Sequence, residues 1–153
     1  MEKDILLDEK LIITNLRATE QQDVLKSLFS KLHKEGCVRD SFLENILKRE
    51  ENFPTGLKLG KYNIAIPHTE PQFVNKSALA VTTLEKPVNF RRMDKPEEEV
   101  PVDIVIMLAL KEKNDHLKVL GKIIQMFQSS QVLESLKKAN NSKEIIEIIK
   151  SNL

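Results

Sequence analysis

Two of the three histidines in this chain stand where an apolar run gives way to a loop or a helix. His68 lies in NIAIPHTE (63–70), directly after Pro67, and His116 opens a predicted helix after the apolar run 101–110. In open α/β sheets, ligands bind outside the carboxyl ends of the strands. If the two strands run parallel, both histidines reach the same rim of the sheet. The spacing alone leaves two interpretations open, namely a functional pair or two polar residues at strand ends.

Several well-known kinds of site lack their residues in this sequence. His68 and His116 with Asp115 make three ligands at most, and no HxxxH motif or cysteine cluster supports a metal centre. There is no GxSxG elbow, Walker A loop, GxGxxG motif or kinase motif set, which disfavours a serine hydrolase and direct use of a nucleotide. Cys37 fits a small buried hydrophobe. His33 fits a partly exposed residue favoured by the dipole of its helix.

The chemistry that remains is a histidine acting as the nucleophile. A neutral imidazole has a lone pair on one ring nitrogen, and its ordinary pKa of about 6.5 leaves much of it unprotonated at neutral pH. Such a nitrogen can attack phosphorus and hold a phosphoryl group through a labile P–N bond. It needs a fixed tautomer and donors for the phosphoryl oxygens. In this interpretation His68 is the nucleophile, Arg49 is the cation and His116 is the donor.

The surrounding segments predict an α/β domain. Runs rich in β-branched residues predict strands, and apolar residues spaced three and four apart predict helices. The predicted strands are 11–16, 64–66, 78–85, 88–90 and 101–110, the predicted helices are 18–36, 40–51, 114–128, 130–139 and 142–150, and 52–63 is a predicted loop. Helices before, between and after apolar strands indicate one central mixed β-sheet flanked by helices on both faces. The short connection 86–101 predicts at least one antiparallel pair of strands.

Local signals predict how individual elements begin and end. Thr19 and Gln22 have the spacing of a capping box, and Gly36 stands where a helix would take a C-terminal cap. Pro67 is expected to end ladder pairing because proline lacks an N–H donor. Leu117 is expected on the buried stripe of its helix.

The length of the chain, 153 residues, predicts one domain spanning residues 1–153. The chain is 41% hydrophobic and 31% charged, as is ordinary for a globular protein. Its 24 basic and 23 acidic residues leave a formal charge of +1, which gives no general electrostatic case for nucleic acid or a membrane surface. The single cysteine fits a reducing compartment. No apolar run approaches the ~20 residues of a membrane span and the charged N-terminus is no secretory signal, so no membrane insertion and a cytoplasmic location are expected.

Three stretches together resemble a known family. KREENFPTG (48–56), NIAIPH (63–68) and DIVIMLAL followed by NDHL (103–117) are similar to the enzyme IIA domain of the mannitol/fructose class of the bacterial sugar phosphotransferase system. The resemblance covers roughly residues 10–150. The segment 87–110, PVNFRRMDKPEEEVPVDIVIMLAL, further resembles the galactitol-type branch. The resemblance implies the family's mixed sheet between helices, with no metal and no other cofactor.

The resemblance also implies roles for particular residues. His68 matches the histidine that accepts a phosphoryl group from the phosphocarrier protein HPr, as tele-phosphohistidine, and passes it to a cysteine of the IIB component, which serves the membrane component IIC. His116 matches a second histidine that stabilises the phosphoryl group. Arg49 matches the arginine of the RE element, which contacts the phosphoryl oxygens. Thr55 matches a loop position that lines the pocket.

The family admits two functions for such a domain. One is a relay that drives uptake of a sugar or polyol, here galactitol-like. The other is a regulatory module of the nitrogen-related branch, in which phosphorylation of His68 changes docking on other proteins.

Thr69 replaces a small residue common in the family and Gly60 is displaced by one position, so loop geometry and sugar specificity do not carry over in detail. The segment 91–99 is expected to be a solvated loop.

Overall fold

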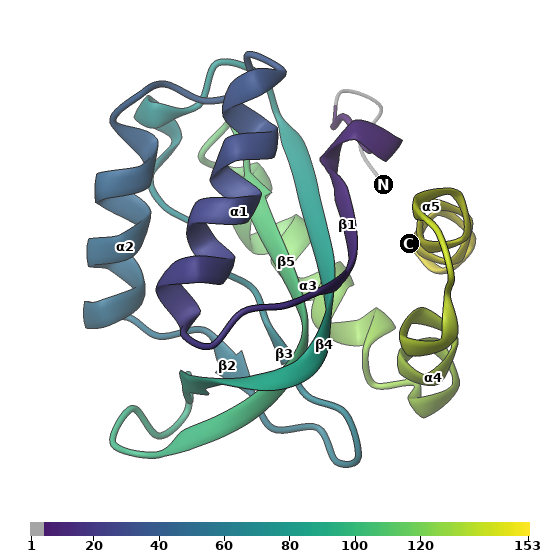
Figure 1. Ribbon diagram of the computed structural model, residues 1–153. Coiled ribbons are helices and arrows are strands. Elements are labelled where there is room, and N and C mark those ends of the chain that lie inside the picture. Colours follow the sequence, from purple (N-terminus) through teal and green to yellow (C-terminus); the bar gives the residue numbers. More distant parts are fainter. Residues whose placement is uncertain (1–4) are drawn as a thin grey trace.

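The computed structural model describes residues 5–153, which form one mixed sheet packed between helices (Figure 1). The strands are β1 (Ile12–Leu16), β2 (Gly56–Leu57), β3 (Ile64–Ala65), β4 (Ala78–Arg91) and β5 (Glu99–Ala109). The helices are α1 (Gln21–Lys34), α2 (Phe42–Asn52), α3 (Asp115–Met126), α4 (Ser130–Lys138) and α5 (Ser142–Asn152), with short 3-10 helices at Glu9–Leu11 and Pro71–Phe73. The strand order is β1-β4-β5-β3-β2.

The pairing of the strands confirms a mixed sheet. β4 and β5 are antiparallel, as the short connection between them predicted, and β2 and β3 are antiparallel as well. β1 runs parallel to β4, and β3 runs parallel to β5 with Ile64 opposite Ile104. The carboxyl ends of β3 and β5 therefore lie side by side at one rim of the sheet.

Both faces of the sheet are buried, which accounts for the nearly continuous apolar sequence of β5. Successive side chains of a strand point to opposite faces. Ile104, Ile106 and Leu108 of β5 belong to the cluster that contains the buried residues of α3, α4 and α5. Val105 and Met107 belong to the cluster that contains those of α1 and α2. Figure 1 shows these two groups of helices on opposite sides of the sheet, as predicted.

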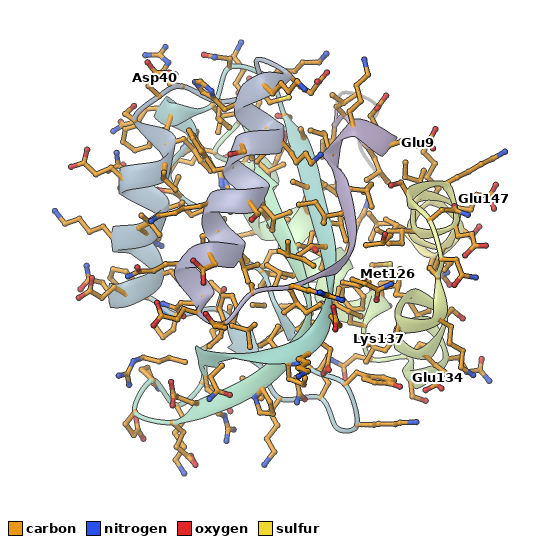
Figure 2. All side chains as sticks on the ribbon, in the orientation of Figure 1. Glu9, Asp40, Met126, Glu134, Lys137 and Glu147 are labelled. Atoms are coloured by element: carbon orange, nitrogen blue, oxygen red, sulfur yellow. The ribbon has the colours of Figure 1, made fainter. Side chains whose placement is uncertain are left out.

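The layer formed by α3, α4 and α5 packs against the sheet through apolar side chains, and a lysine side chain of α4 adds a hydrogen bond to β4. Met126 of α3 lies in the core, and Lys137 of α4 extends toward the sheet (Figure 2). The Nζ atom of Lys137 donates a hydrogen bond to the carbonyl oxygen of Leu84 in β4 at 2.7 Å. This layer holds the first turn of α3, which carries His116. Across residues 5–153, none of the helices has both the length and the apolar character needed to cross a membrane.

Two predictions about strands are wrong in detail. The predicted strands 78–85 and 88–90 form one strand, β4, because its pairing with β5 continues past a register shift between Thr83 and Val88. The predicted loop 52–63 contains β2, which is only two residues long and therefore leaves no periodic pattern in the sequence. Gly56 of β2 lies so close to β4 that a Cβ atom there would come within 2.6 Å of the Arg91 carbonyl oxygen.

Of three predictions about helix ends and helix faces, one is confirmed and two are wrong. The predicted capping box of Thr19 and Gln22 is wrong, because the first turn of α1 is closed by Asp23, whose carboxylate accepts the N–H of Glu20 at 3.2 Å. Gly36 does follow the end of α1 in the left-handed region, with φ of 74°, as a C-terminal cap requires. Leu117 was expected to be buried and is 84% exposed.

Candidate functional site

The paired carboxyl ends of β3 and β5 bring two histidines together. The main chain stays beside β5 after β3 ends, because the Pro67 carbonyl accepts the N–H of Leu108 at 2.9 Å and His68 forms a bridge with Leu108. Pro67 therefore does not end the pairing as predicted, since it lacks a donor but keeps its acceptor. The ring centroids of His68 and His116 are 5.9 Å apart, with the ring planes inclined at 48°. The prediction that both histidines share one rim is confirmed.

The His68 ring has one of its two nitrogens engaged by the main chain. Its Nδ1 lies 2.8 Å from the carbonyl oxygen of Ile66. Because a carbonyl can only accept, Nδ1 carries the proton and Nε2 keeps the lone pair of the neutral ring. Burial lowers the pKa of His68 below its usual value, the bond to Ile66 raises it, and the charges of His116 and Arg49 lower it further. The site thus favours a neutral imidazole with its free lone pair on Nε2.

The Nε2 atom of His116 is a buried polar atom without a partner. Among the side-chain nitrogen and oxygen atoms buried within residues 5–153, only this one lacks a hydrogen bond. An unsatisfied buried polar atom costs about 1–3 kcal/mol, so such atoms are rare unless a ligand meets them. The ring that carries this unpaired atom lies 5.9 Å, centroid to centroid, from the ring of His68.

Arg49 brings positive charge to the site from the last turn of α2. Its guanidinium Cζ lies 4.5 Å from the centroid of the Phe53 ring, a cation–π contact that holds the side chain in place. Its charge reaches His68, where it opposes protonation. The same charge would attract the oxygens of a phosphoryl group on that ring.

Two exposed apolar side chains adjoin these residues. Phe53 is 61% exposed and Leu117 is 84% exposed, and they are the exposed large hydrophobic residues of the described chain. Phe53 contacts Arg49, and Leu117 follows His116 at the start of α3. Single exposed apolar side chains are common on protein surfaces, and these two are set apart by their place beside Arg49 and His116.

Glu50, which the sequence reading did not single out, is buried beneath this end of α2. It is 2% exposed, and its two carboxylate oxygens accept hydrogen bonds from the N–H and the hydroxyl of Thr55, each at 2.8 Å. Burial raises the pKa of Glu50 to about 7, although the two bonds from Thr55 lower it. Thr55, expected to line the pocket, is itself 2% exposed and directs its hydroxyl to Glu50.

The remaining reactive side chains are engaged elsewhere. His33 pairs with Asp40 through its Nε2 atom, and Cys37 is buried with burial raising the pKa of its thiol. Between residues 5 and 153, no three His, Cys, Asp or Glu side chains come together as a group that could hold a metal. The rim of the sheet brings together His68 and His116, and the charge of Arg49 acts on His68.

Solved structures show the class of fold first. The chain superposes on enzyme IIAMTL, solved in a complex with phosphorylated enzyme IIBMTL from Escherichia coli, with a TM-score of 0.79, 21% identity, and coverage of 96% of this chain and 99% of that one. It also superposes on Nitrogen Regulatory Protein IIA-Ntr from Neisseria meningitidis, with a TM-score of 0.74, 23% identity, and coverage of 93% and 94%. These likenesses show the fold, a mixed sheet flanked by helices of the enzyme IIA type.

The family follows from the sequence comparison. Residues 5–152 match the model of the family "Phosphoenolpyruvate-dependent sugar phosphotransferase system, EIIA 2", and the chain belongs to this family of phosphotransferases, which work through a phosphohistidine intermediate. A curated relative, the galactitol-specific EIIA component of Escherichia coli (strain K12), is 29% identical over 117 residues, which are 76% of this chain and 77% of that protein. The resemblance read from the three sequence stretches is confirmed.

Proposed function

We propose that this chain, as a single cytoplasmic domain, relays a phosphoryl group from phospho-HPr to a cysteine of a IIB component through the Nε2 atom of His68. The IIB component would pass the group on as the membrane component IIC takes up a sugar or polyol. One observation carries the proposal: Nδ1 of His68 lies 2.8 Å from the Ile66 carbonyl oxygen, which leaves Nε2 as the nucleophile. The neighbouring ring of His116, 5.9 Å away between centroids, has an unpaired Nε2. The relative named for galactitol supports a galactitol-like substrate for the system.

In the first step, the Nε2 lone pair of His68 attacks the phosphorus of phospho-HPr in line. The new N–P bond forms as the bond between phosphorus and its HPr donor atom breaks, and the bonding electron pair leaves with HPr. Charge spreads over the three phosphoryl oxygens in the transition state. Arg49 supplies positive charge to them, and the Nε2–H form of His116 donates a hydrogen bond. The proton stays on Nδ1 of His68, hydrogen-bonded to the Ile66 carbonyl oxygen, and balances part of the new negative charge.

In the second step, the thiolate of the IIB cysteine attacks the same phosphorus. An S–P bond forms, the N–P bond breaks, and its electron pair returns to Nε2 of His68. The ring is then neutral with Nδ1 still protonated, so it is ready for the next phosphoryl group. His68 thereby serves as acceptor and leaving group without a change of tautomer.

The exposed side chains Phe53 and Leu117 are proposed to bind the partner proteins. Leu117→Ser should raise the KM for phospho-HPr about tenfold, as loss of about 1.4 kcal/mol at an interface anchor would. The value of kcat should stay close to that of the wild type, because the reacting groups are unchanged. Steady-state turnover with a IIB component present as acceptor, at increasing phospho-HPr concentrations, measures both constants. Leu117→Met keeps the apolar bulk and is the matched control, and an unchanged KM in Leu117→Ser would remove Leu117 from the docking surface.

The experiment that tests the proposed function is to locate the phosphoryl group. The protein is incubated with phosphoenolpyruvate, enzyme I and HPr, and the product is examined by 31P and 15N nuclear magnetic resonance. A phosphoryl group on Nε2 of His68, discharged when a IIB component is added, is the expected result. A phosphoryl group on Nδ1, on another residue or on none would overturn the proposal.

Sugar uptake separates transport from regulation. The gene should restore uptake of galactitol or a related polyol in a strain that lacks its own galactitol IIA. Uptake that is not restored, with His68 phosphorylated normally, would instead support the regulatory role, in which the phosphoryl group changes the charge of a docking surface.

A further inference from the structure

A continuous path of hydrogen bonds connects buried Glu50 to the ring of His68. The carboxylate of Glu50 accepts two hydrogen bonds from Thr55, and the Thr55 carbonyl accepts the N–H of Ile66. The Ile66 carbonyl in turn accepts the N–H at Nδ1 of His68. We propose that Glu50, acting through Thr55, is a positioning residue for His68, because it holds in place the carbonyl that fixes the ring's tautomer. This inference rests on the proposed role of His68 as the phosphoryl acceptor.

The first link of the path is rigid because it is buried and doubly bonded. Glu50 and Thr55 are each 2% exposed, and both carboxylate oxygens are used, one by the N–H and one by the hydroxyl of Thr55, at 2.8 Å each. Two bonds to one residue fix its orientation as well as its distance. A buried carboxyl group costs more to bring out of water than a neutral residue would, so stability alone gives little reason for a glutamate here.

The second link carries the position of Thr55 to the end of β3. The Thr55 carbonyl accepts the N–H of Ile66 at 3.4 Å, and the next residue, Gly56, pairs with Ala65. Gly56 packs closely against β4, since a Cβ atom on it would lie 2.6 Å from the carbonyl oxygen of Arg91. The contact between Glu50 and Thr55 therefore helps to set where the start of β2 lies against the end of β3.

The third link is the one that matters for chemistry. The Ile66 carbonyl selects the ring tautomer with the proton on Nδ1, at 2.8 Å. If that carbonyl rotates away, the tautomer with the proton on Nε2 becomes populated, and its Nε2 has no lone pair with which to attack phosphorus. Loss of the contact between Glu50 and Thr55 would therefore lower the fraction of His68 that can react.

The test uses variants that remove or keep the contact. Thr55→Val removes one of the two hydrogen bonds, the one from the hydroxyl, at nearly unchanged shape, and Glu50→Leu removes both acceptors. We expect long-range 1H–15N correlation spectra of the unphosphorylated variants to show the two ring nitrogens of His68 shifted toward a mixture of tautomers. We also expect the rate of phosphoryl acceptance to fall about tenfold, since small displacements of reacting groups have effects of this size or larger.

The conservative variants should have the His68 ring signals and the acceptance rate of the wild type. Thr55→Ser keeps the hydroxyl, and Glu50→Gln can accept the N–H of Thr55 with its oxygen and donate to the hydroxyl with its amide nitrogen. Glu51→Leu removes the exposed neighbouring carboxylate and is the matched control. If Glu50→Leu does not fold, Thr55→Val still tests the contact. A merely structural role would lower the free energy of unfolding without changing the His68 ring signals.

Two results would overturn the inference. One is a folded Thr55→Val protein whose His68 ring signals and acceptance rate equal those of the wild type. The other is a reduced rate with unchanged ring signals, which would place the effect of Thr55 elsewhere. Failure of the proposed function is recognised separately, because the wild-type protein would then carry no phosphoryl group on His68 whatever its tautomer.

Discussion

His68→Gln should not accept a phosphoryl group from phospho-HPr. Glutamine is polar and of comparable size, but the lone pair of its amide nitrogen is delocalised and cannot attack phosphorus. The wild-type ring presents a free lone pair on Nε2 because Nδ1 is held by the Ile66 carbonyl at 2.8 Å. Labelling from phosphoenolpyruvate through enzyme I and HPr should fall by about 10⁴-fold or more, the scale on which loss of a catalytic nucleophile acts.

Two other histidine variants make this result specific. His33→Gln changes a histidine that pairs with Asp40, and it should be labelled like the wild type. His116→Ala keeps the nucleophile and loses only the Nε2 donor, so it should accept the phosphoryl group but pass it slowly to a IIB component. Equal labelling of His68→Gln and the wild type would refute the role of His68. Complete loss of acceptance in His116→Ala would refute the division of work between the two histidines.

The rim that carries the two histidines could be predicted because it depends on strong, long-range features of the sequence. The apolar runs that form β3 and β5 are visible as strands, and a histidine follows each run. Once the strands are assumed parallel, His68 and His116 must be neighbours, although 48 positions separate them in the sequence. Arg49 could be proposed as the cation because it lies at the end of a strongly periodic helix, α2.

What escaped prediction depends on short contacts that leave little trace in the sequence. β2 has two residues, and its place beside β3 is set by tertiary pairing rather than by a pattern. Glu50 did leave a signal, since Phe42, Ile46 and Glu50 follow one another at a spacing of four on the buried face of α2. A carboxylate on an apolar stripe needs a partner, and Thr55 is that partner. The spacing reveals that Glu50 is buried, but only the folded loop shows what it binds.

Glu50→Gln should make the protein more stable than the wild type above pH 7, by an amount that grows as the pH rises from 4.5. Burial raises the pKa of Glu50 from 4.5 to about 7 in the folded protein, so the folded state binds more protons than the unfolded state between these values. The free energy of unfolding of the wild type therefore decreases as the pH rises through this range. At about 1.36 kcal/mol for each pKa unit, the loss attributable to Glu50 is about 3 kcal/mol.

The difference between the two proteins isolates this effect from every other titrating group. Urea unfolding from pH 4.5 to 8 should give curves that converge at acidic pH and separate by about 3 kcal/mol above pH 7, with the glutamine variant higher. Glu51→Gln, which removes an exposed carboxylate of the same helix, should stay parallel to the wild type. Curves that stay parallel for Glu50→Gln as well would show that the buried carboxyl group titrates alike in the folded and unfolded states. Separation of the curves together with unchanged phosphoryl acceptance would show that the contact with Thr55 needs the hydrogen bonds of residue 50 and not its charge.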